Sequence, residues 1–408
     1  MKAITFLGVR PQTALYTMNG KEYAASQFGV ALARFIPNLT LRALVTKKAL
    51  DEQYPAFERD VEDYVADVRA VPITDGKDAD ELWQLFDSVV DQIEENEEVI
   101  FDITHGFRSL PFLAFLAAAY VRVVKRAQIK GVYYANYDAG FGDPRQVPVV
   151  DLTEFVALLD WMIAADLFSK RGDSSRLAAL MRTDLREMTP AQRQIHREAA
   201  SSTMVTSMTS ISSSLRRLRP EEVMKASHQL ITHLEEGGDA FARSARPFVP
   251  LLDQVADAYR PLAFANPRED LYAALAIERE LVSWYLDRGY LVQATAVARE
   301  WLVTWALLQQ GITSIYERAS RTDMENAITA QRAHHSGQPR ESPLSIADMP
   351  HSKELADLFQ NVARVRNDLL HAGKNASPME GGTLEKNIRK YCDKLADFPL
   401  PTPKQTSP

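Results

Sequence analysis

The chain has 408 residues, of which 46% are hydrophobic and 25% charged, a composition typical of a globular protein with two or three domains. The formal net charge of −7 argues against the broad basic surface of a nonspecific nucleic-acid binder and leaves room only for a local basic pocket. The sequence contains no stretch long and apolar enough for a membrane span, no signal-peptide pattern and a single cysteine, Cys392. We therefore expect a soluble, cytoplasmic protein without disulfides.

The first 150 residues alternate short apolar runs with amphipathic stretches. The apolar runs predict strands at 3–8, 41–46, 68–73, 98–104, 130–136 and 146–152. Apolar residues at three- and four-residue spacing predict helices at 21–36, at 78–95 and from 109 to about 126. This order predicts a mostly parallel sheet with helices on both faces, which binds ligands outside the carboxyl ends of its strands.

After about residue 150 the strand pattern disappears. Helical spacing predicts helices at 151–170, 201–218, 270–287, 291–310 and 353–373. Glycine and proline residues predict breaks at 235–250 and 265–270, and the polar stretch 330–343, with its His334–His335 pair, is predicted to be a loop. The end of the chain, 400–408, is expected to be disordered. The predicted fold class is therefore α/β followed by all-α.

The segment 102–109, DITHGFRS, lies between a predicted strand and a predicted helix. Ser109 is a predicted N-cap, and Pro111 is tolerated in a first helical turn, so THGFR lies on the turn itself. Free backbone N–H groups and the helix macrodipole favour an anion at such a place. The turn therefore predicts part of a ligand site.

A second loop is expected to share that site. The first predicted strand ends at Gly8, so the loop that follows should open on the same edge of the sheet. Gly8 would let the backbone pass close to a ligand. The side chains with suitable chemistry are, for phosphates, Arg10, Thr13 and Arg108 and, for a ribose or base, Thr104 and His105.

Other interpretations of these loops stay open. The turn could serve only as a helix cap, with His105 hydrogen-bonded to backbone. A hydrolase triad of Asp102, His105 and Ser109 is disfavoured because one short turn is poorly suited to hold a relay and G-x-S-x-G is absent. A metal site lacks a second pair of ligands, and neither a G-x-G-x-x-G nor a P-loop sequence is present to support a dehydrogenase or a P-loop enzyme.

A second group of polar residues closes the predicted helix 353–373, where Gly373 is the expected C′ residue. Asn367 and His371 are four residues apart and share a helical face, which Arg366 can reach with its long side chain. Histidine and arginine supply the acid, the base and the positive charge that metal-free cleavage of RNA by its own 2′-hydroxyl requires. One histidine does not conveniently act as both acid and base, so a two-fold dimer would complete the site. The alternative is that His371 only interacts with terminal carbonyls of its helix.

Together, DITHG (102–106) and RNDLLH (366–371) resemble the motifs of a group of CRISPR-associated proteins named for the sequence D-x-T-H-G. The resemblance implies an amino-terminal Rossmann-like CARF domain, which senses cyclic oligoadenylates made by type III CRISPR complexes, and a carboxyl-terminal helical HEPN ribonuclease domain. It places the cyclic ligand at Gly8 and at Thr104, His105, Gly106 and Arg108, next to Asp102 and Ser109. It places the nuclease site at Arg366, Asn367 and His371.

The resemblance implies a sensor domain at 1–150, a helical connector at 151–265, a nuclease domain at 266–400 and a tail at 401–408. The function so implied is that of a homodimeric endoribonuclease for single-stranded RNA that uses no metal or cofactor. Its activator would be a cyclic oligoadenylate, with cyclic tetra-adenylate the favoured ring. Two alternatives stay open: a nucleotide-sensing regulator without nuclease activity, and a small-molecule Rossmann enzyme that uses Asp102 and His105.

Overall fold

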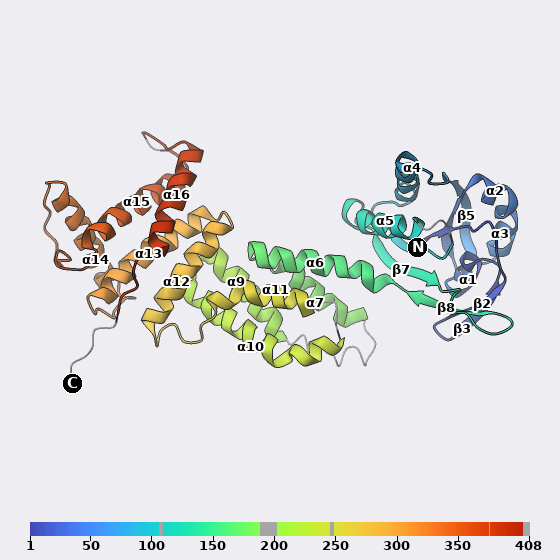
Figure 1. The fold of residues 1–408 in the computed structure, drawn as a ribbon, viewed down its shortest axis with the longest axis horizontal. Coiled ribbons are helices and arrows are strands. Elements are labelled where there is room, and N and C mark those ends of the chain that lie inside the picture. The colour runs from blue at the N-terminus through green and yellow to red at the C-terminus, as the bar shows by residue number, and fades with distance from the viewer. Residues whose placement is uncertain (106–108, 188–201, 245–248, 375, 403–408) are drawn as a thin grey trace. The chain divides into compact units, whose positions relative to one another are not determined.

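The computed structural model describes residues 1–105, 109–187, 202–244, 249–374 and 376–402. The chain forms two compact units, Met1–Asp160 and Trp161–Pro408 (Figure 1). The sequence change expected near residue 150 therefore lies close to the division at 160, and the finer division of the helical part at 265 stays a prediction.

The first unit contains a single sheet of eight strands within the described residues, in the order β3-β2-β8-β7-β6-β1-β4-β5. The central strands pair in parallel, whereas β2 with β3 and β7 with β8 pair antiparallel. The strands are β1 (Lys2–Phe6), β2 (Ala14–Met18), β3 (Lys21–Ala25), β4 (Leu39–Val45), β5 (Val65–Pro72), β6 (Glu98–Asp102), β7 (Gln128–Ala135) and β8 (Gln146–Asp151). The predicted α/β fold with a mostly parallel sheet is confirmed.

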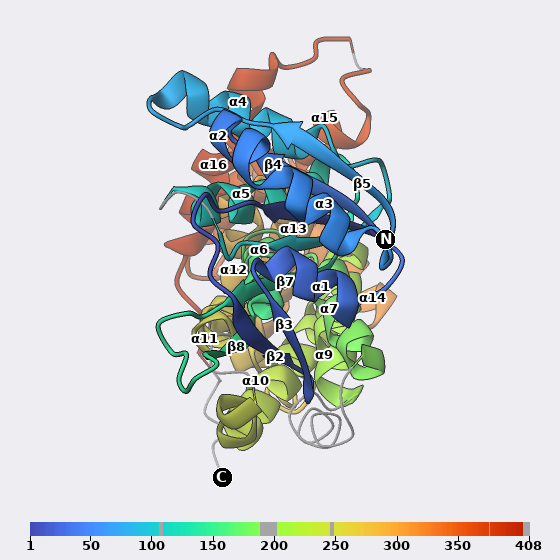
Figure 2. The same cartoon turned by 90° about the vertical axis from the view of Figure 1, so that its right-hand side faces the viewer.

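Helices cover both faces of this sheet. One face packs against α1 (Phe28–Phe35), α2 (Lys47–Glu52) and α3 (Tyr54–Val61), and the other against α4 (Ala79–Val90) and α5 (Leu110–Val124). Helices α2 and α3 lie beside β4 and β5, whereas α1 lies against the β2–β3 hairpin (Figure 2). Every residue of β1 is buried because both of its faces are covered, and its two polar residues have partners: Lys2 pairs with Glu97, and Thr5 donates to Asp102.

The prediction of one helix over 21–36 is wrong in its first half. Residues Lys21–Ala25 form β3, which pairs antiparallel with β2, and α1 begins only at Phe28. The turn between the two strands is Asn19-Gly20, and both residues have positive φ, 51° and 75°. Asn-Gly with two positive φ angles is the preferred two-residue hairpin connection, so the local turn chemistry prevails over the helical spacing of the apolar residues.

The second unit is helical throughout its described residues. Its helices are α6 (Thr153–Arg171, which begins in the first unit), α7 (Ser175–Glu187), α9 (Ser202–Arg217), α10 (Pro220–Ser244), α11 (Val249–Tyr259), α12 (Leu271–Asp287), α13 (Leu291–Gln309), α14 (Arg318–His335), α15 (Ser352–Leu370) and α16 (Gly381–Ala396), with a short 3-10 turn at Arg260–Leu262. Helix α13 forms the centre, with Trp301 and Trp305 fully buried, and packs against α12, α14, α15 and α16. None of the helices in the described ranges has the length and apolarity to cross a membrane.

Most predicted helices of this unit are confirmed, including the Ser/Thr/Met-rich stretch that forms α9. The break predicted at 235–250 contains the end of α10 at Ser244 and the start of α11 at Val249, but the glycine pair at 237–238 does not interrupt α10, because two glycines cost only about 2 kcal/mol in a helix whose preceding turns are buried. One prediction is wrong. Helix α14 continues to His335, so the His334–His335 pair ends a helix and does not lie on a loop. At the end of the chain Pro401 is buried, and residues 403–408 lie outside the described residues.

Candidate functional site

The loops after β1 and β6 leave the sheet at the same edge, as predicted. The two strands are parallel neighbours, with Thr5 opposite Asp102. After the β2–β3 hairpin at the far edge of the sheet, β4 and β5 lie on one side of β1, whereas β6 and β7 lie on the other side. The gap between β1 and β6 is thus the topological switch point, the place where doubly wound sheets bind ligands.

Asp102 holds this edge together from inside. It is completely buried, its Oδ2 accepts a hydrogen bond from Thr5 Oγ1 at 2.5 Å, and its Oδ1 accepts one from Thr104 N at 2.9 Å. The second bond is an Asx turn, in which an aspartate fixes the backbone two residues further on. Burial raises the pKa of Asp102, against the opposing effects of His105 and the two donors. The geometry therefore gives Asp102 the role of positioning the turn.

Thr104 anchors the same turn to the neighbouring strand. Its Oγ1 accepts a hydrogen bond from Ala135 N at 2.9 Å, and the N–H of Ile103 donates to Tyr133 O at 3.0 Å. The turn is therefore fixed to β1 through Asp102 and to β7 through Thr104 before any ligand is considered.

His105 lies at the start of α1. Its Nε2 accepts a hydrogen bond from Phe28 N, at 3.3 Å, which is one of the N–H groups that a helix start leaves without a partner. The helix-cap interpretation of this histidine is thus present in the structure. An accepting Nε2 places the ring proton on Nδ1, and burial lowers the pKa of His105, which keeps the ring neutral.

Gly8 contacts the same histidine and is held from the other side by Gln27. The backbone N–H and carbonyl of Gly8 bond the Gln27 side chain at 3.0 and 3.1 Å. A Cβ built on Gly8 would lie 3.3 Å from His105 Nδ1, closer than most real Cβ contacts. The close approach of His105 thus favours glycine at this position, and the predicted passage of the backbone close to a ligand stays a prediction.

Aromatic residues that the sequence did not single out complete this edge. The hydroxyls of Tyr16 and Tyr137 are hydrogen-bonded to each other, and Tyr137 donates to Gln12 O at 3.0 Å. The ring of Tyr137 lies 6.0 Å from that of His105, between centroids. Tyr16 was missed because it belongs to the unrecognised hairpin, and Asn19-Gly20 was the signal that could have found it.

The remaining predicted ligand residues differ in position. Arg10 and Thr13 are exposed on the loop between β1 and β2. Ser109 occupies the N-cap position of α5 but makes no capping hydrogen bond, because its backbone is already helical at φ −76° and ψ −21°. Gly106 and Arg108 lie outside the described residues.

The fold and this edge define a doubly wound α/β domain with a candidate ligand site at its switch point. Residues 3–138 match the family model described as "CRISPR system endoribonuclease Csx1, CARF domain". A segment of 125 residues is 30% identical to "CRISPR-associated protein MJ1674" of Methanocaldococcus jannaschii. The aligned segment covers 30% of this chain and 20% of that protein. The first unit is therefore similar over residues 3–138 to the CARF domain of CRISPR-associated proteins, in agreement with the D-x-T-H-G resemblance. The chain spans one fifth of the length of the curated relative it matches.

The second candidate site lies at the exposed end of α15. Arg366 Nη1 donates to Asn367 Oδ1 at 3.1 Å, whereas the buried Nε of Arg366 has no hydrogen-bond partner. The backbone N–H of His371 donates to Asn367 O at 2.9 Å, and both side chains are exposed. The structure thus brings Arg366 and Asn367 into contact and places His371 one helical turn beyond, open to an incoming polymer.

The end of α15 is a Schellman motif displaced by one residue from the prediction. The N–H of Gly373 donates to Asp368 O at 3.1 Å and that of Ala372 donates to Leu369 O at 3.0 Å. The C′ residue is therefore Ala372, with φ 52°, and Gly373 follows with φ 68°. The buried Asp368 accepts a bond from Met379 N at 3.3 Å, which holds the returning segment beside the motif.

Replacing Asp102 with Asn should flatten the pH dependence of stability. Because burial raises the pKa of Asp102 above its ordinary 3.8, the folded state keeps a proton that the unfolded chain releases, and stability falls as pH rises from that value to the folded pKa. Asn retains an acceptor for Thr104 N–H but does not titrate. Urea unfolding of both proteins between about pH 4 and 7 measures the slope. An unchanged slope in Asp102→Asn would contradict this role, and Asp102→Ala should cost about 1–3 kcal/mol by leaving Thr104 N–H unpaired.

Substitutions at the two positions that end α15 should act with opposite signs. Ala372→Gly relieves a left-handed conformation that costs an L-residue about 1 kcal/mol, so it should stabilise the helical unit by up to that amount. Gly373→Ala places a Cβ at positive φ, in ordinary van der Waals contact with Pro378 at 3.8 Å, and should destabilise by a similar amount because of the backbone conformation alone. Thermal unfolding of the two variants tests the assignment, and a stabilising Gly373→Ala would show that the C′ residue is misplaced.

Proposed function

We propose that this protein is an ancillary ribonuclease of type III CRISPR systems, in which cyclic oligoadenylate bound to the CARF domain activates cleavage of single-stranded RNA by the helical unit. The observation that carries the proposal is the pairing, in one chain, of a matched CARF domain with an R-N-x-x-x-H sequence at the exposed end of a helix. The relative and the family model are CRISPR-associated, which supports the same context.

The edge between β1 and β6 has the chemistry for a ring of nucleotides. Neutral His105 carries its proton on Nδ1, next to Gly8, where it can donate to a phosphate or ribose oxygen. Arg10 and Thr13 are exposed beside this edge and free to reach outward. By the resemblance, Gly106 and Arg108 of the adjoining turn complete the ligand contacts. Cyclic tetra-adenylate is the ring that we favour.

The proposed chemistry at α15 is an in-line displacement on phosphorus. A base removes the proton of the ribose 2′-hydroxyl, a bond forms between O2′ and phosphorus, and the bond from phosphorus to O5′ breaks as an acid protonates the leaving oxygen. His371 supplies acid or base and Arg366 stabilises the charge of the phosphorane, while Asn367 orients Arg366 through their hydrogen bond. The products are a 2′,3′-cyclic phosphate and a 5′-hydroxyl. No metal takes part in these steps.

A dimer would bring two such motifs together, and α5 offers a surface for it. Counted from Phe112, this helix exposes further apolar side chains four, eight, eleven and twelve residues along the chain. Phe112 is 66% exposed and Val123 68%. The full set, called the α5 patch, is Phe112, Leu116, Tyr120, Val123 and Val124. Phe86 and Trp83 of α4 extend this α5 patch through edge-on ring contacts. Since α5 begins where the 102–109 turn ends, pairing through this patch would place both copies of the turn near one interface.

Activation would then be a shift between two states of the dimer. A ligand that makes better contacts with the cleaving state raises its population by its difference in affinity for the two states. The CARF edge supplies the differential contacts and the paired α15 motifs supply the response.

The central test adds labelled single-stranded RNA to the protein with and without cyclic oligoadenylates of different ring size. We expect cleavage that depends on the ring and persists in EDTA, with a 2′,3′-cyclic phosphate at the new end.

Arg108→Ala should shift the activation curve to a ligand concentration roughly ten- to a hundredfold higher by removing a charge-assisted phosphate contact, yet the variant should regain activity at saturating ligand. Loss of cleavage in EDTA that magnesium restores would overturn the metal-free mechanism. Ligand binding with intact RNA would favour a regulator, and turnover of a mononucleotide at the CARF edge would favour a small-molecule enzyme.

His371→Ala should abolish cleavage at any activator concentration while ligand binding remains unchanged, because residue 371 lies in the helical unit and the ligand edge in the other. The matched control is His335→Ala, which removes another exposed histidine at the end of a neighbouring helix, α14. That variant should cleave like the parent. Initial cleavage rates and direct ligand binding for both variants measure the difference. Equal activity of His371→Ala and parent would remove catalysis from 366–371.

Phe112→Glu with Val123→Glu should convert the dimer to monomer and lower cleavage at least tenfold, because two charges would have to be buried in an apolar interface. Val292→Glu, which adds charge at an exposed apolar position of the helical unit, is the control. Sedimentation velocity gives the oligomeric state and the RNA assay gives the rate. A fully active monomer would contradict the proposed pairing.

A further inference from the structure

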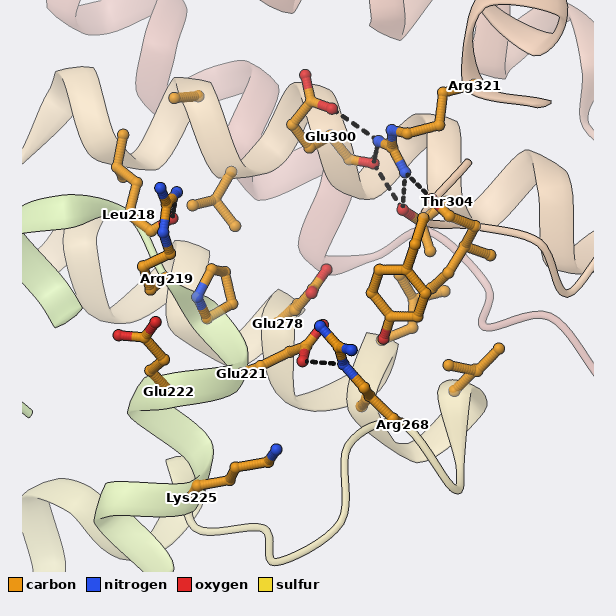
Figure 3. A pocket seen from close by; sticks show the side chains of 18 residues that line it. Leu218, Arg219, Glu221, Glu222, Lys225, Arg268, Glu278, Glu300, Thr304 and Arg321 are labelled. Carbon is orange, nitrogen blue, oxygen red and sulfur yellow. Dashed lines mark hydrogen bonds and ion pairs between the residues drawn. The ribbon is translucent and has the colours of Figure 1, made fainter. Parts of the chain in front are cut away.

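The helical unit contains a cavity of about 820 Å³ that is separate from both proposed sites. It is formed by the first turn of α10, the middle of α12 and α13, and the segment that leads into α14 (Figure 3). None of its lining residues belongs to 102–109 or to 366–371. Its volume lies in the range of small-molecule sites, roughly 300–1,000 Å³.

Glu278 of α12 points into this cavity without a partner. Two other carboxylates face it but are already paired: Glu221 with Arg268 at 2.8 Å and Glu300 with Arg321 at 2.7 Å. Glu278 itself makes no hydrogen bond or ion pair with the rest of the described chain. Its acceptor oxygens are therefore available to a ligand.

The surroundings of Glu278 raise its pKa to about 7. The largest cause is loss of solvent around the carboxyl; Arg321 lowers the pKa, whereas Glu221 and Glu300 raise it further. Tyr316 also lines this side of the cavity. The guanidinium carbon of Arg268 lies over its ring, 4.7 Å from the ring centroid. A ligand that donates hydrogen bonds to the ionised carboxylate of Glu278 would therefore bind more tightly as the pH rises through this pKa.

The side of the cavity formed by α10 has the opposite character. Arg219 and Lys225 are exposed, and neither forms an ion pair within the described residues. Apolar side chains also line the cavity, among them Leu275 and Val297. The cavity thus combines an unpaired carboxyl, an apolar wall and two unpaired cations.

We propose that this cavity binds a guanine nucleotide unit, with the base toward Glu278 and the phosphate toward Arg219 and Lys225. Guanine carries two adjacent donors, N1–H and the N2 amino group, which match the two oxygens of one carboxylate. Adenine, cytosine and uracil present no such pair of neighbouring donors on that edge. The two cations match a phosphate, and the apolar wall suits a flat ring.

The nucleotide unit has two possible sources, a free guanine nucleotide or a guanosine within RNA. Calorimetry with guanosine monophosphate and adenosine monophosphate on the full-length chain tests the first. Single-stranded RNA hexamers with one guanosine or none test the second, in a His371→Ala background so that the RNA stays intact. These arms measure binding, so they give an answer even if the protein proves not to be a nuclease.

We expect the guanine probe to bind at least about tenfold more tightly than the guanine-free probe in one of the two arms, and Glu278→Gln to remove this preference. Affinity should rise about tenfold from pH 6 to pH 8 as Glu278 ionises. Lys225→Ala should weaken binding severalfold without changing base preference, and it tests the site even if Glu278→Gln fails to fold. Glu222→Gln is the control, since Glu222 lines the same cavity but already accepts from Ser214. Equal affinity for both probes in both arms, or a preference that Glu278→Gln and Lys225→Ala leave unchanged, would overturn the proposal.

Discussion

The buried carboxyl of Asp102 is the constraint on which the ligand edge depends. It joins β6 to β1 through the equally buried Thr5 and fixes the following turn through the N–H of the half-buried Thr104. A buried carboxyl is costly unless its oxygens have donors, so the two threonines and the aspartate stabilise one geometry together. In the sequence D-x-T-H-G, the first and third residues therefore hold the turn in place, and the residues after them are the ones left to contact a ligand.

The start of α1 links this turn to the opposite loop. His105 accepts a hydrogen bond from Phe28 N. The side chain of Gln27, the residue before Phe28, accepts a hydrogen bond from Gly8 N and donates one to Gly8 O. One helix start thus fixes the histidine and the glycine loop in the same register. The structural and the ligand-binding interpretations of His105 are not exclusive, because capping uses Nε2 and leaves the N–H of Nδ1, next to Gly8, as a second polar group.

Much of the first unit could be predicted because buried parallel strands have continuous apolar sequences and the motif marks the end of β6. The errors have local physical causes. The β2–β3 hairpin follows from the two positive φ angles of Asn19-Gly20, which the helical spacing of 21–36 concealed. Helix α14 extends into a polar segment because the buried Met324, Ala327 and Ile328 anchor it. The bonds from Ala135 to Thr104 and from Phe28 to His105 join residues far apart in the chain, and no pattern along the sequence specifies such pairs.

The proposed nuclease motif and its single histidine could both be located from sequence, whereas the exposure of His371 and the contact between Arg366 and Asn367 are visible only in the structure. His371 is exposed, and the Arg366 fork already shares one hydrogen bond with Asn367, so one chain presents a single acid or base beside a single cation. In-line cleavage protonates one oxygen while it deprotonates another, on opposite sides of the phosphorus. A solitary exposed histidine does not satisfy both positions at once. Two copies of α15 related by a two-fold axis would satisfy them with the same residues, and that symmetry would also let one cyclic ligand contact both CARF domains. The demand of the chemistry at α15 and the exposed apolar face of α5 are thus two separate arguments for a dimer, one from each unit.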